Sequence, residues 1–286
     1  MEEFKRVFGI KFIMVFTVTV LLNIGLFVYS SSEGKSMSDI RQETHYRQWI
    51  IGELSDMQPE EALEIANIQS DSVIKRKYDE LEPEEQTVYS RQLNKIKEQL
   101  EYIIKYPEDI KNIQNNADTL KSFSIFADKN SFTYNNIQKT AKDFKRVEGV
   151  QLYLTDNKAV SGFVTYYYIY YLALILNVFV LYELFGEREN GMWCIVHTSK
   201  SGRAKLAFNR TMIITASAFI ITGVLFFTTF LTSFILYKTA SINAPIQNIE
   251  SFSRFSLPMS QLEYIIYDFL YSFCAVLTLT AIVWMA

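Results

Sequence analysis

The sequence predicts an all-α membrane protein with about four transmembrane helices and a helical extracytoplasmic domain between the first and second spans. Four long apolar stretches alternate with polar segments along the 286 residues, and about 20 apolar residues are enough for a helix to cross a bilayer. Charge is also segregated, because residues 31–160 hold 23 of the 31 acidic and 18 of the 28 basic residues. A single soluble core does not sort its charges in this way, whereas a membrane protein with one inserted polar domain does.

Residues 1–30 are predicted to form an N-terminal interfacial segment and the first transmembrane helix. Phe12–Ser30 is an apolar run of 19 residues, longer than the core of a signal peptide, and this favours an uncleaved anchor over a cleaved leader. Lys5, Arg6 and Lys11 precede the run, and positive charge beside a first span favours a cytoplasmic N-terminus. The segment before the span is expected to lie in the membrane interface or to form a plain flanking tail.

Residues 31–159 are predicted to form the extracytoplasmic domain, a small bundle of helices. Pro83, followed by two glutamates, is typical of a helix start, and Pro107 is expected to restart the pattern in a second helix. A third helix is predicted to begin near Ser131 and to end at Gly149. Apolar residues at helical spacing define the core-facing stripes: Leu93, Ile96, Leu100 and Ile103; Ile110, Ile113, Ala117 and Leu120; Ile137, Ala141 and Phe144.

Three further spans are predicted at residues 160–182, 211–237 and 265–286. The outer loop between the last two, residues 238–264, is expected to include a short segment lying on the outer face of the membrane. Because the fourth span reaches Ala286 without a basic residue to mark its exit, the chain is expected to be a shortened version of a protein with six spans, or else to end at the inner interface. Tyrosines crowd the start of the second span, where they suit the outer membrane interface or, alternatively, a substrate-facing lining: Tyr166, Tyr167, Tyr168, Tyr170 and Tyr171.

A cytoplasmic loop is predicted at residues 183–210, and it is the best-marked feature of the chain. We expect a helix, a turn near Gly202, and a second short helix parallel to the membrane. Five basic residues in so short a loop place it in the cytoplasm: Arg188, Lys200, Arg203, Lys205 and Arg210.

No catalytic or cofactor-binding motif emerges, so an enzyme is not expected. The chain has no Gly-rich phosphate loop with its lysine, no Gly-x-Ser-x-Gly and no His-Glu-x-x-His motif. Cys194, Cys274, His45 and His197 lack metal-ligand spacing, so we expect no metal site and incidental thiols. One basic run, Lys75–Lys77, is expected to be a solvated surface, and nucleic-acid binding is not expected.

Three polar residues fall within the predicted spans. Asp268 is the one acidic residue inside a predicted span, and an ionisable group in lipid is a candidate functional residue, although its position near the outer end also allows plain contact with water. Asn23 and Asn177 are expected to make interhelical hydrogen bonds.

The loop also resembles a known family. Glu187-Arg188-Glu189-Asn190-Gly191, then Thr198-Ser199-Lys200-Ser201-Gly202-Arg203 and then Arg210 at the next span are similar to the loop of the permease subunits of type-2 ABC exporters. The layout of the chain is similar as well, especially to bacterial permeases with a large helical outer domain that are linked to peptide-antibiotic resistance. The chain departs from the family in two respects: Lys200-Ser201 stands where many members have a proline, and four spans are visible instead of six.

The resemblance implies a multi-pass permease of the bacterial cell membrane that works in the lipid bilayer with a dimeric cytoplasmic P-loop ATPase and a second permease, identical or sister. Such a permease would use ATP hydrolysis by its partner to export an amphiphilic substrate, either a peptide antibiotic or a lipid-like molecule. The loop would dock on the ATPase through Glu187, Glu189, Gly191, Met192, Trp193 and Arg203, with Arg203 alternatively holding anionic lipid headgroups. Two other hypotheses are a membrane sensor or immunity protein whose outer domain binds an antimicrobial peptide, and a membrane scaffold without transport.

Overall fold

The structure is a computed structural model that describes residues 7–67, 73–123, 131–185, 200–238 and 241–285. These residues form α-helices and short 3-10 helices, and the one β-bridge among them pairs Pro245 with Ser260. The all-α prediction is therefore confirmed for the part of the chain that is described.

The chain divides into two compact units. Unit 1 consists of Met1–Gly34, Gly162–Ile235 and Ile265–Ala286. Unit 2 consists of Lys35–Ser161 and Leu236–Tyr264. The polar domain and the loop between the third and fourth predicted spans therefore belong to one folded body, although the chain between them contributes two apolar helices to the other unit.

Unit 1 is built from helices that are long and apolar enough to cross a membrane. The sequence of α2 (Ile10–Ser32) meets this condition, as do most of α11 (Lys200–Tyr237) and most of α12 (Gln261–Met285). A fourth candidate is a broken one, in which α8 (Lys158–Val164) and α9 (Tyr168–Phe185) are bent by 44°. The second predicted span is therefore interrupted near its start.

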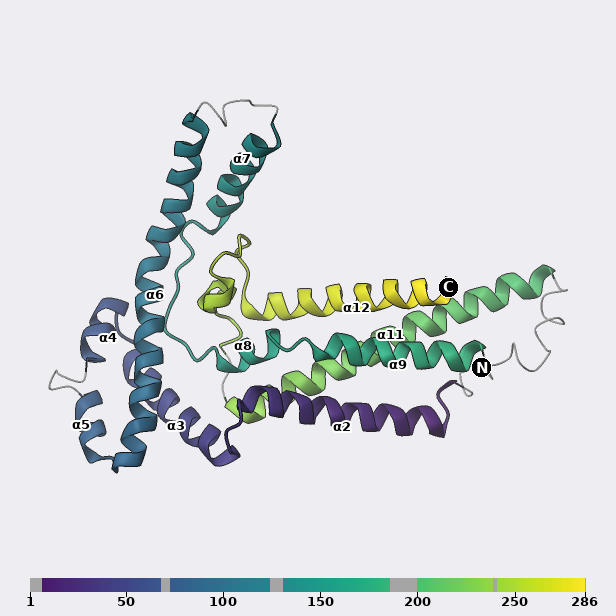
Figure 1. Ribbon diagram of the computed structural model, residues 1–286, viewed down its shortest axis with the longest axis horizontal. Coiled ribbons are helices and arrows are strands. Elements are labelled where there is room, and N and C mark those ends of the chain that lie inside the picture. Colours follow the sequence, from purple (N-terminus) through teal and green to yellow (C-terminus); the bar gives the residue numbers. More distant parts are fainter. Residues whose placement is uncertain (1–6, 68–72, 124–130, 186–199, 239–240, 286) are drawn as a thin grey trace. The chain divides into compact units, whose positions relative to one another are not determined.

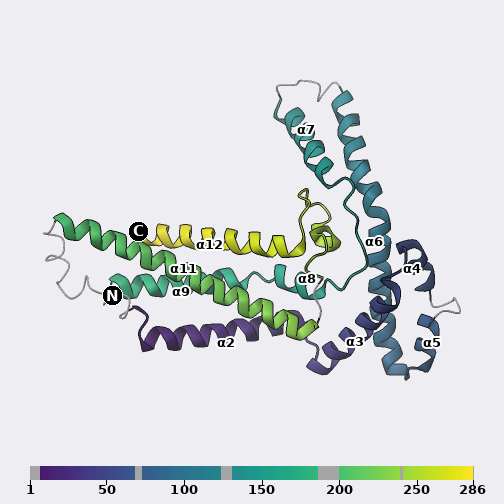
Figure 2. The ribbon, with the colours of Figure 1, turned by 180° about the vertical axis from the view of Figure 1, so that it is seen from behind.

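Neighbouring helices of unit 1 run antiparallel, and Figures 1 and 2 show α2, α9, α11 and α12 side by side. The last residues of α2 and α11 therefore lie at the same end of unit 1 as the first residues of α9 and α12. The chain passes between the two units at this end. Residues 186–199 join the opposite ends of α9 and α11. The contacts that set the directions are Phe12–Phe179 and Asn23–Tyr166, then Asn177–Ser217 and Tyr170–Phe226, then Phe219–Phe273 and Phe226–Phe269.

The start of α11 differs from the prediction. Residues 200–210 were expected to hold a turn and a short helix parallel to the membrane, but they are the first turns of α11. Gly202 lies inside this helix because a single glycine costs only about 1 kcal/mol in a helical run, and good helix formers such as Ala204, Lys205 and Leu206 follow it.

Unit 2 is organised around the long helix α6 (Pro83–Ser122). The shorter helices α3 (Met37–Leu54), α4 (Pro59–Ile65), α5 (Val73–Glu80) and α7 (Phe132–Phe144) pack against it (Figure 1). Ser36 caps α3 through a capping box with Asp39. The Ser131 side chain caps α7, so the predicted start near Ser131 is confirmed, but the α-helix ends at Phe144 instead of Gly149 and a 3-10 turn, Lys145–Val147, follows it. The core contains the first predicted stripe of α6, whose four members are almost fully buried: Leu93, Ile96, Leu100 and Ile103.

Pro107 does not divide this helix, so the prediction of two helices was wrong. Proline removes one backbone hydrogen bond and crowds the preceding turn, at a cost of roughly 3 kcal/mol. Its neighbours Tyr106 and Ile110 are buried in the unit 2 core, and this packing keeps the helix continuous. Pro107 itself lies on the exposed side.

Residues 241–264 belong to unit 2, and the short segment on the outer face of the membrane stays a prediction. They make two 3-10 turns, η4 (Ile246–Asn248) and η5 (Glu250–Phe252), and the first is buried. The Asn248 amide donates to the carbonyl of Tyr153 at 2.6 Å, and that of Asn157 donates to the carbonyl of Asn248 at 3.0 Å. Local periodicity does not predict this packing, because the two side-chain hydrogen bonds join residues more than 90 positions apart.

Candidate functional site

The candidate site in unit 1 is a buried polar network at the break between α8 and α9. Three residues, Thr165–Tyr167, separate the two helices. Instead of the α-helical pattern, the Tyr166 N–H donates to the carbonyl of Phe163 at 3.1 Å, and the Thr165 hydroxyl donates to the carbonyl of Gly162 at 3.3 Å. No proline occurs at the break, so its geometry is stabilised by these short-range bonds and by the contacts of Tyr166.

Tyr166 is buried, and its hydroxyl donates to both the side-chain Oδ1 and the backbone carbonyl of Asn23 on α2, each at 3.1 Å. The Asn23 amide in turn donates to the Thr229 hydroxyl on α11 at 2.8 Å. The Tyr166 ring packs edge-on against Phe27 at 5.2 Å between centroids. One network therefore joins α2, the helix break and α11, and each of its three polar side chains has a hydrogen-bond partner.

Two further polar pairs join the helices of unit 1. The Tyr170 hydroxyl donates to Asp268 Oδ1 at 3.1 Å, which links α9 to α12. The Ser217 hydroxyl donates to Asn177 Oδ1 at 3.3 Å, which links α11 to α9. Hydrogen bonds of this kind in apolar helix bundles contribute roughly 0.6–2 kcal/mol each.

All three predicted intramembrane polar residues thus make hydrogen bonds between helices. For Asn23 and Asn177 this is the role that the sequence analysis expected. Asp268 is half-buried beside a tyrosine hydroxyl, and a carboxylate in an apolar bundle is a group that can take up a cation or a proton. Among the described residues, no group of three His, Cys, Asp or Glu side chains is placed to hold a metal ion.

Four of the five tyrosines at the start of the second span divide into two groups. Tyr167 and Tyr171 are 53% and 59% exposed, as suits residues at a membrane interface. Tyr166 and Tyr170 instead point their hydroxyls at Asn23 and Asp268. Sequence reasoning treated all five alike, as interface residues or alternatively as a substrate-facing lining, because consecutive tyrosines carry no signal of which ones face the interior.

The residues of the predicted coupling motif are placed as follows. Glu187, Glu189, Gly191, Met192 and Trp193 lie outside the described residues. The backbone of Arg203 belongs to the first turn of α11. The next arginine of the motif, Arg210, is buried.

Sequence reasoning missed Thr229, which completes the Asn23 network. In the sequence, Thr229 is recognisable only as a polar residue in an apolar run, and the same is true of Thr222, Thr228 and Thr232. Thr228 and Thr232 bond carbonyls of their own helix. Only the packing of α11 on α2 distinguishes Thr229 from them.

Comparisons with protein-family models, with curated proteins and with solved structures found no match to this chain.

Proposed function

We propose that the chain is the permease subunit of an ABC exporter in the cell membrane, with its N-terminus in the cytoplasm. Unit 1 spans the bilayer and unit 2 lies outside the cell. A separate dimeric ATPase hydrolyses ATP and drives export of an amphiphilic substrate, a peptide antibiotic or a lipid-like molecule. A second permease, identical or sister, completes the membrane path.

The observation that carries this proposal is the order of the chain through its two units. The two segments of unit 2, Lys35–Ser161 and Leu236–Tyr264, fold together, and four apolar helices connect to them at matching ends. The loop with the Glu-x-Glu-x-Gly motif joins the opposite ends of α9 and α11. If the apolar helices cross a membrane, the motif and unit 2 are on opposite sides, which is the arrangement that an outer domain and a cytoplasmic coupling loop require.

Charge supports the orientation. Lys5, Arg6 and Lys11 stand before α2, and five basic residues stand in the loop at residues 183–210. In the sequence, both groups adjoin the ends of the apolar helices that do not connect to unit 2. Positive residues near the ends of spans favour the cytoplasmic side, so unit 2 is assigned to the outside.

The test is affinity purification of the tagged full chain in mild detergent, followed by mass spectrometry and an ATPase assay. We expect a P-loop ATPase in stoichiometric amount, and we expect the double variant Glu187→Lys with Glu189→Lys to lose it. The matched control is Glu98→Lys with Glu101→Lys, which makes the same charge change on the exposed side of α6. The control is expected to retain the ATPase.

Two outcomes would contradict the proposal. An ATPase that keeps full binding and permease-stimulated hydrolysis with the Glu187/Glu189 variant would show that the loop is not the docking site. Absence of any ATPase with an intact, folded chain would reject the exporter and favour the sensor or the scaffold.

A further inference from the structure

Unit 2 contains a cluster of two cationic side chains around the ring of Tyr237. The Arg47 guanidinium lies 5.9 Å from the centre of this ring, and the Lys158 ammonium lies 5.9 Å from the same centre. The Arg47 Nε and the Lys158 backbone N–H also share one acceptor, Asp156 Oδ1, at 2.8 and 3.1 Å. The two cationic residues are therefore held close together, although they come from α3 and from the start of α8.

The cluster has more positive than negative charge. Asp156 is the one carboxylate in the contacts just described, and it accepts from the Nε side of Arg47. Lys238, the next residue after Tyr237, adds an exposed cation. Three cationic side chains thus stand against one carboxylate among these residues, and such a field attracts an anion.

Arg47 has an unsatisfied donor in the cluster. Its Nη2 atom is buried and makes no hydrogen bond within the described structure, although a guanidinium offers five N–H donors. A buried charged donor without an acceptor is unfavourable. The Arg47 side chain keeps 12% of its surface exposed, so it lies at the edge of the core. A phosphate matches the planar guanidinium, and one of its oxygens would supply the missing acceptor.

The cluster lies where one apolar helix ends and another begins. Tyr237 is the last residue of the candidate span Ala204–Tyr237, and Lys158 is the first residue of the broken candidate span. In a bilayer, the ends of spans meet the lipid headgroups, and tyrosine, lysine and arginine side chains there place their polar ends among the headgroups. This position favours a lipid as the source of the phosphate.

We propose that this cluster binds the phosphate group of an anionic phospholipid. Arg47 Nη2 donates to one phosphate oxygen, and the half-buried Lys158 ammonium binds another. The Tyr237 ring keeps both cations in place, and the acyl chains of the lipid remain in the bilayer.

This inference goes beyond the proposed transport function. It requires that the apolar helices cross a membrane, but it requires neither an ATPase nor the loop at residues 183–210. Absence of an ATPase would leave the lipid site intact, and failure of lipid binding would leave the coupling proposal intact.

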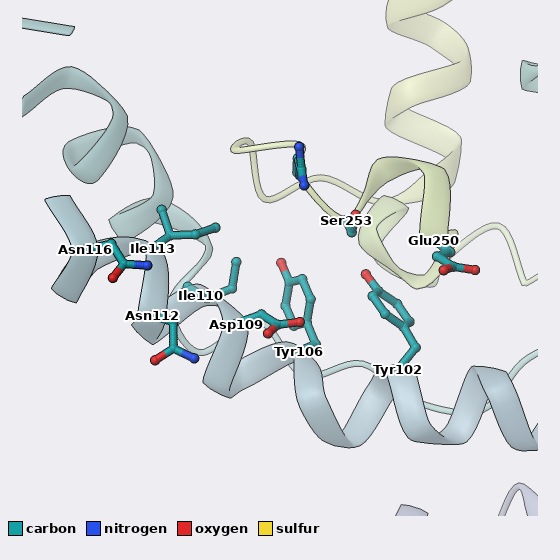
Figure 3. A pocket seen from close by; sticks show the side chains of 10 residues that line it. Tyr102, Tyr106, Asp109, Ile110, Asn112, Ile113, Asn116, Glu250 and Ser253 are labelled. Carbon is teal, nitrogen blue, oxygen red and sulfur yellow. The ribbon is translucent and has the colours of Figure 1, made fainter. Parts of the chain in front are cut away.

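A pocket of about 490 Å³ elsewhere in unit 2 is the competing location for an anion (Figure 3). It lies between α6 and the segment that includes η5, and the Tyr102 hydroxyl joins its two walls by donating to the carbonyl of Gln247 at 2.7 Å. Arg254 is the cationic side chain in its lining, which includes no residue of the cluster. Arg254→Met is therefore the matched control, because it removes an exposed positive charge from unit 2 at a different place.

The test is native mass spectrometry of the full chain in a neutral detergent. The probe is dioleoyl phosphatidylglycerol, and its matched partner is dioleoylglycerol, which has the same acyl chains and no phosphate. We expect phosphatidylglycerol to bind at least about tenfold more tightly, because each cation near a lipid headgroup contributes about fivefold. Lys158→Met should weaken phosphatidylglycerol by about fivefold, whereas Lys158→Arg and Arg254→Met should change it by less than about twofold. An unchanged affinity for dioleoylglycerol shows that each variant is intact.

A double variant separates direct contact from net charge. Arg47→Met with Asp156→Asn removes the guanidinium, leaves the net charge unchanged and leaves no buried charge unpaired. We expect it to weaken phosphatidylglycerol by about fivefold, although a purely long-range attraction would predict no change.

Three results would each overturn the proposal: equal affinity for the two lipids, an equal loss in Lys158→Met and Arg254→Met, or full affinity in the Arg47/Asp156 double variant. Inorganic phosphate at the concentration of the lipid should not displace phosphatidylglycerol. Displacement would show that the cluster takes a soluble phosphate, and it would overturn the lipid assignment.

Discussion

The buried ion pair between Arg47 of α3 and Asp156 gives the most quantitative prediction. Arg47 Nε lies 2.8 Å from Asp156 Oδ1, and the two side chains are 12% and 6% exposed. The same carboxylate oxygen accepts the Lys158 N–H at 3.1 Å at the start of α8. The Arg47 guanidinium also lies 5.9 Å from the centre of the Tyr237 ring. The Asp156 carboxylate thus connects α3 with the start of α8, and Arg47 connects this pair with the end of α11 within unit 2.

Asp156→Asn keeps an oxygen that can accept from Lys158 but removes the negative charge. Arg47 then stays buried without its counter-charge, a change that costs about 3–5 kcal/mol in other proteins. The comparison pair is Glu43 with Arg91, 3.3 Å apart, in which the arginine is half exposed. Arg91→Gln is expected to cost about 0.2–1 kcal/mol, because solvent screens that pair.

The assay is hydrogen exchange of the full chain in nanodiscs, read at the amides of α3. A loss of 3 kcal/mol is roughly a 100-fold rise in the population of the open state, since about 1.4 kcal/mol corresponds to a factor of ten. Arg91→Gln should change the same amides by less than about fivefold. The double variant Arg47→Met with Asp156→Asn should recover much of the loss, because no charge is left buried.

The reasoning is refuted if Asp156→Asn exchanges no faster than Arg91→Gln. It is also refuted if the double variant is as unstable as the sum of the two single variants. In either case the pair at 2.8 Å would not stabilise unit 2 through its charges.

Three further predictions concern the stability of unit 2, the stability of unit 1 and the labelling of unit 2 on intact cells. Burial raises the pKa of Tyr106 from 10 to about 12. The unfolded chain therefore ionises first, so the free energy of unfolding of unit 2 is unaffected by this group below pH 10 and falls by up to about 3 kcal/mol as the pH rises to 12. Tyr106→Phe should reduce this loss in denaturant unfolding. Asn23→Leu should destabilise unit 1 by about 1–2 kcal/mol in thermal melts, whereas Thr17→Val, on the exposed face of α2, should change it by less than about 0.5 kcal/mol. Cysteines at Lys139 and Ser251, both exposed, should react with an impermeant maleimide from the same side of intact cells; labelling of only one would contradict the joint folding of unit 2.

Most helices of this fold could be predicted from the sequence because their signals are local. Apolar length predicts α2, α11 and α12, and a capping serine with a following apolar stripe predicts α7. Pro107 shows the limit of such signals. Proline strongly disfavours a helix interior, yet burial of Tyr106 and Ile110 on either side outweighs that local cost.

The contacts that assemble the candidate sites are different in kind, since they join distant parts of the chain. Asn23 and Tyr166 are 143 residues apart, and Tyr102 and Gln247 are 145 apart. No periodicity within one segment encodes such a pair. Sequence reasoning could therefore identify Asn23 as a polar residue in an apolar run, but not the tyrosine that bonds to it.

The break between α8 and α9 combines both kinds of information. A span without proline is expected to continue as one helix, and the break at Tyr166 leaves backbone groups that an apolar environment would leave unsatisfied. The hydroxyl of Tyr166 bonds to the backbone carbonyl and the side chain of Asn23, so the neighbouring helix stabilises the broken conformation. The chain from α8 to α9 connects unit 2 with residues 183–210. A conformational change in the proposed coupling loop that moved α9 relative to α2 would therefore have to break the Tyr166–Asn23 hydrogen bonds, and the loss of these bonds can be measured.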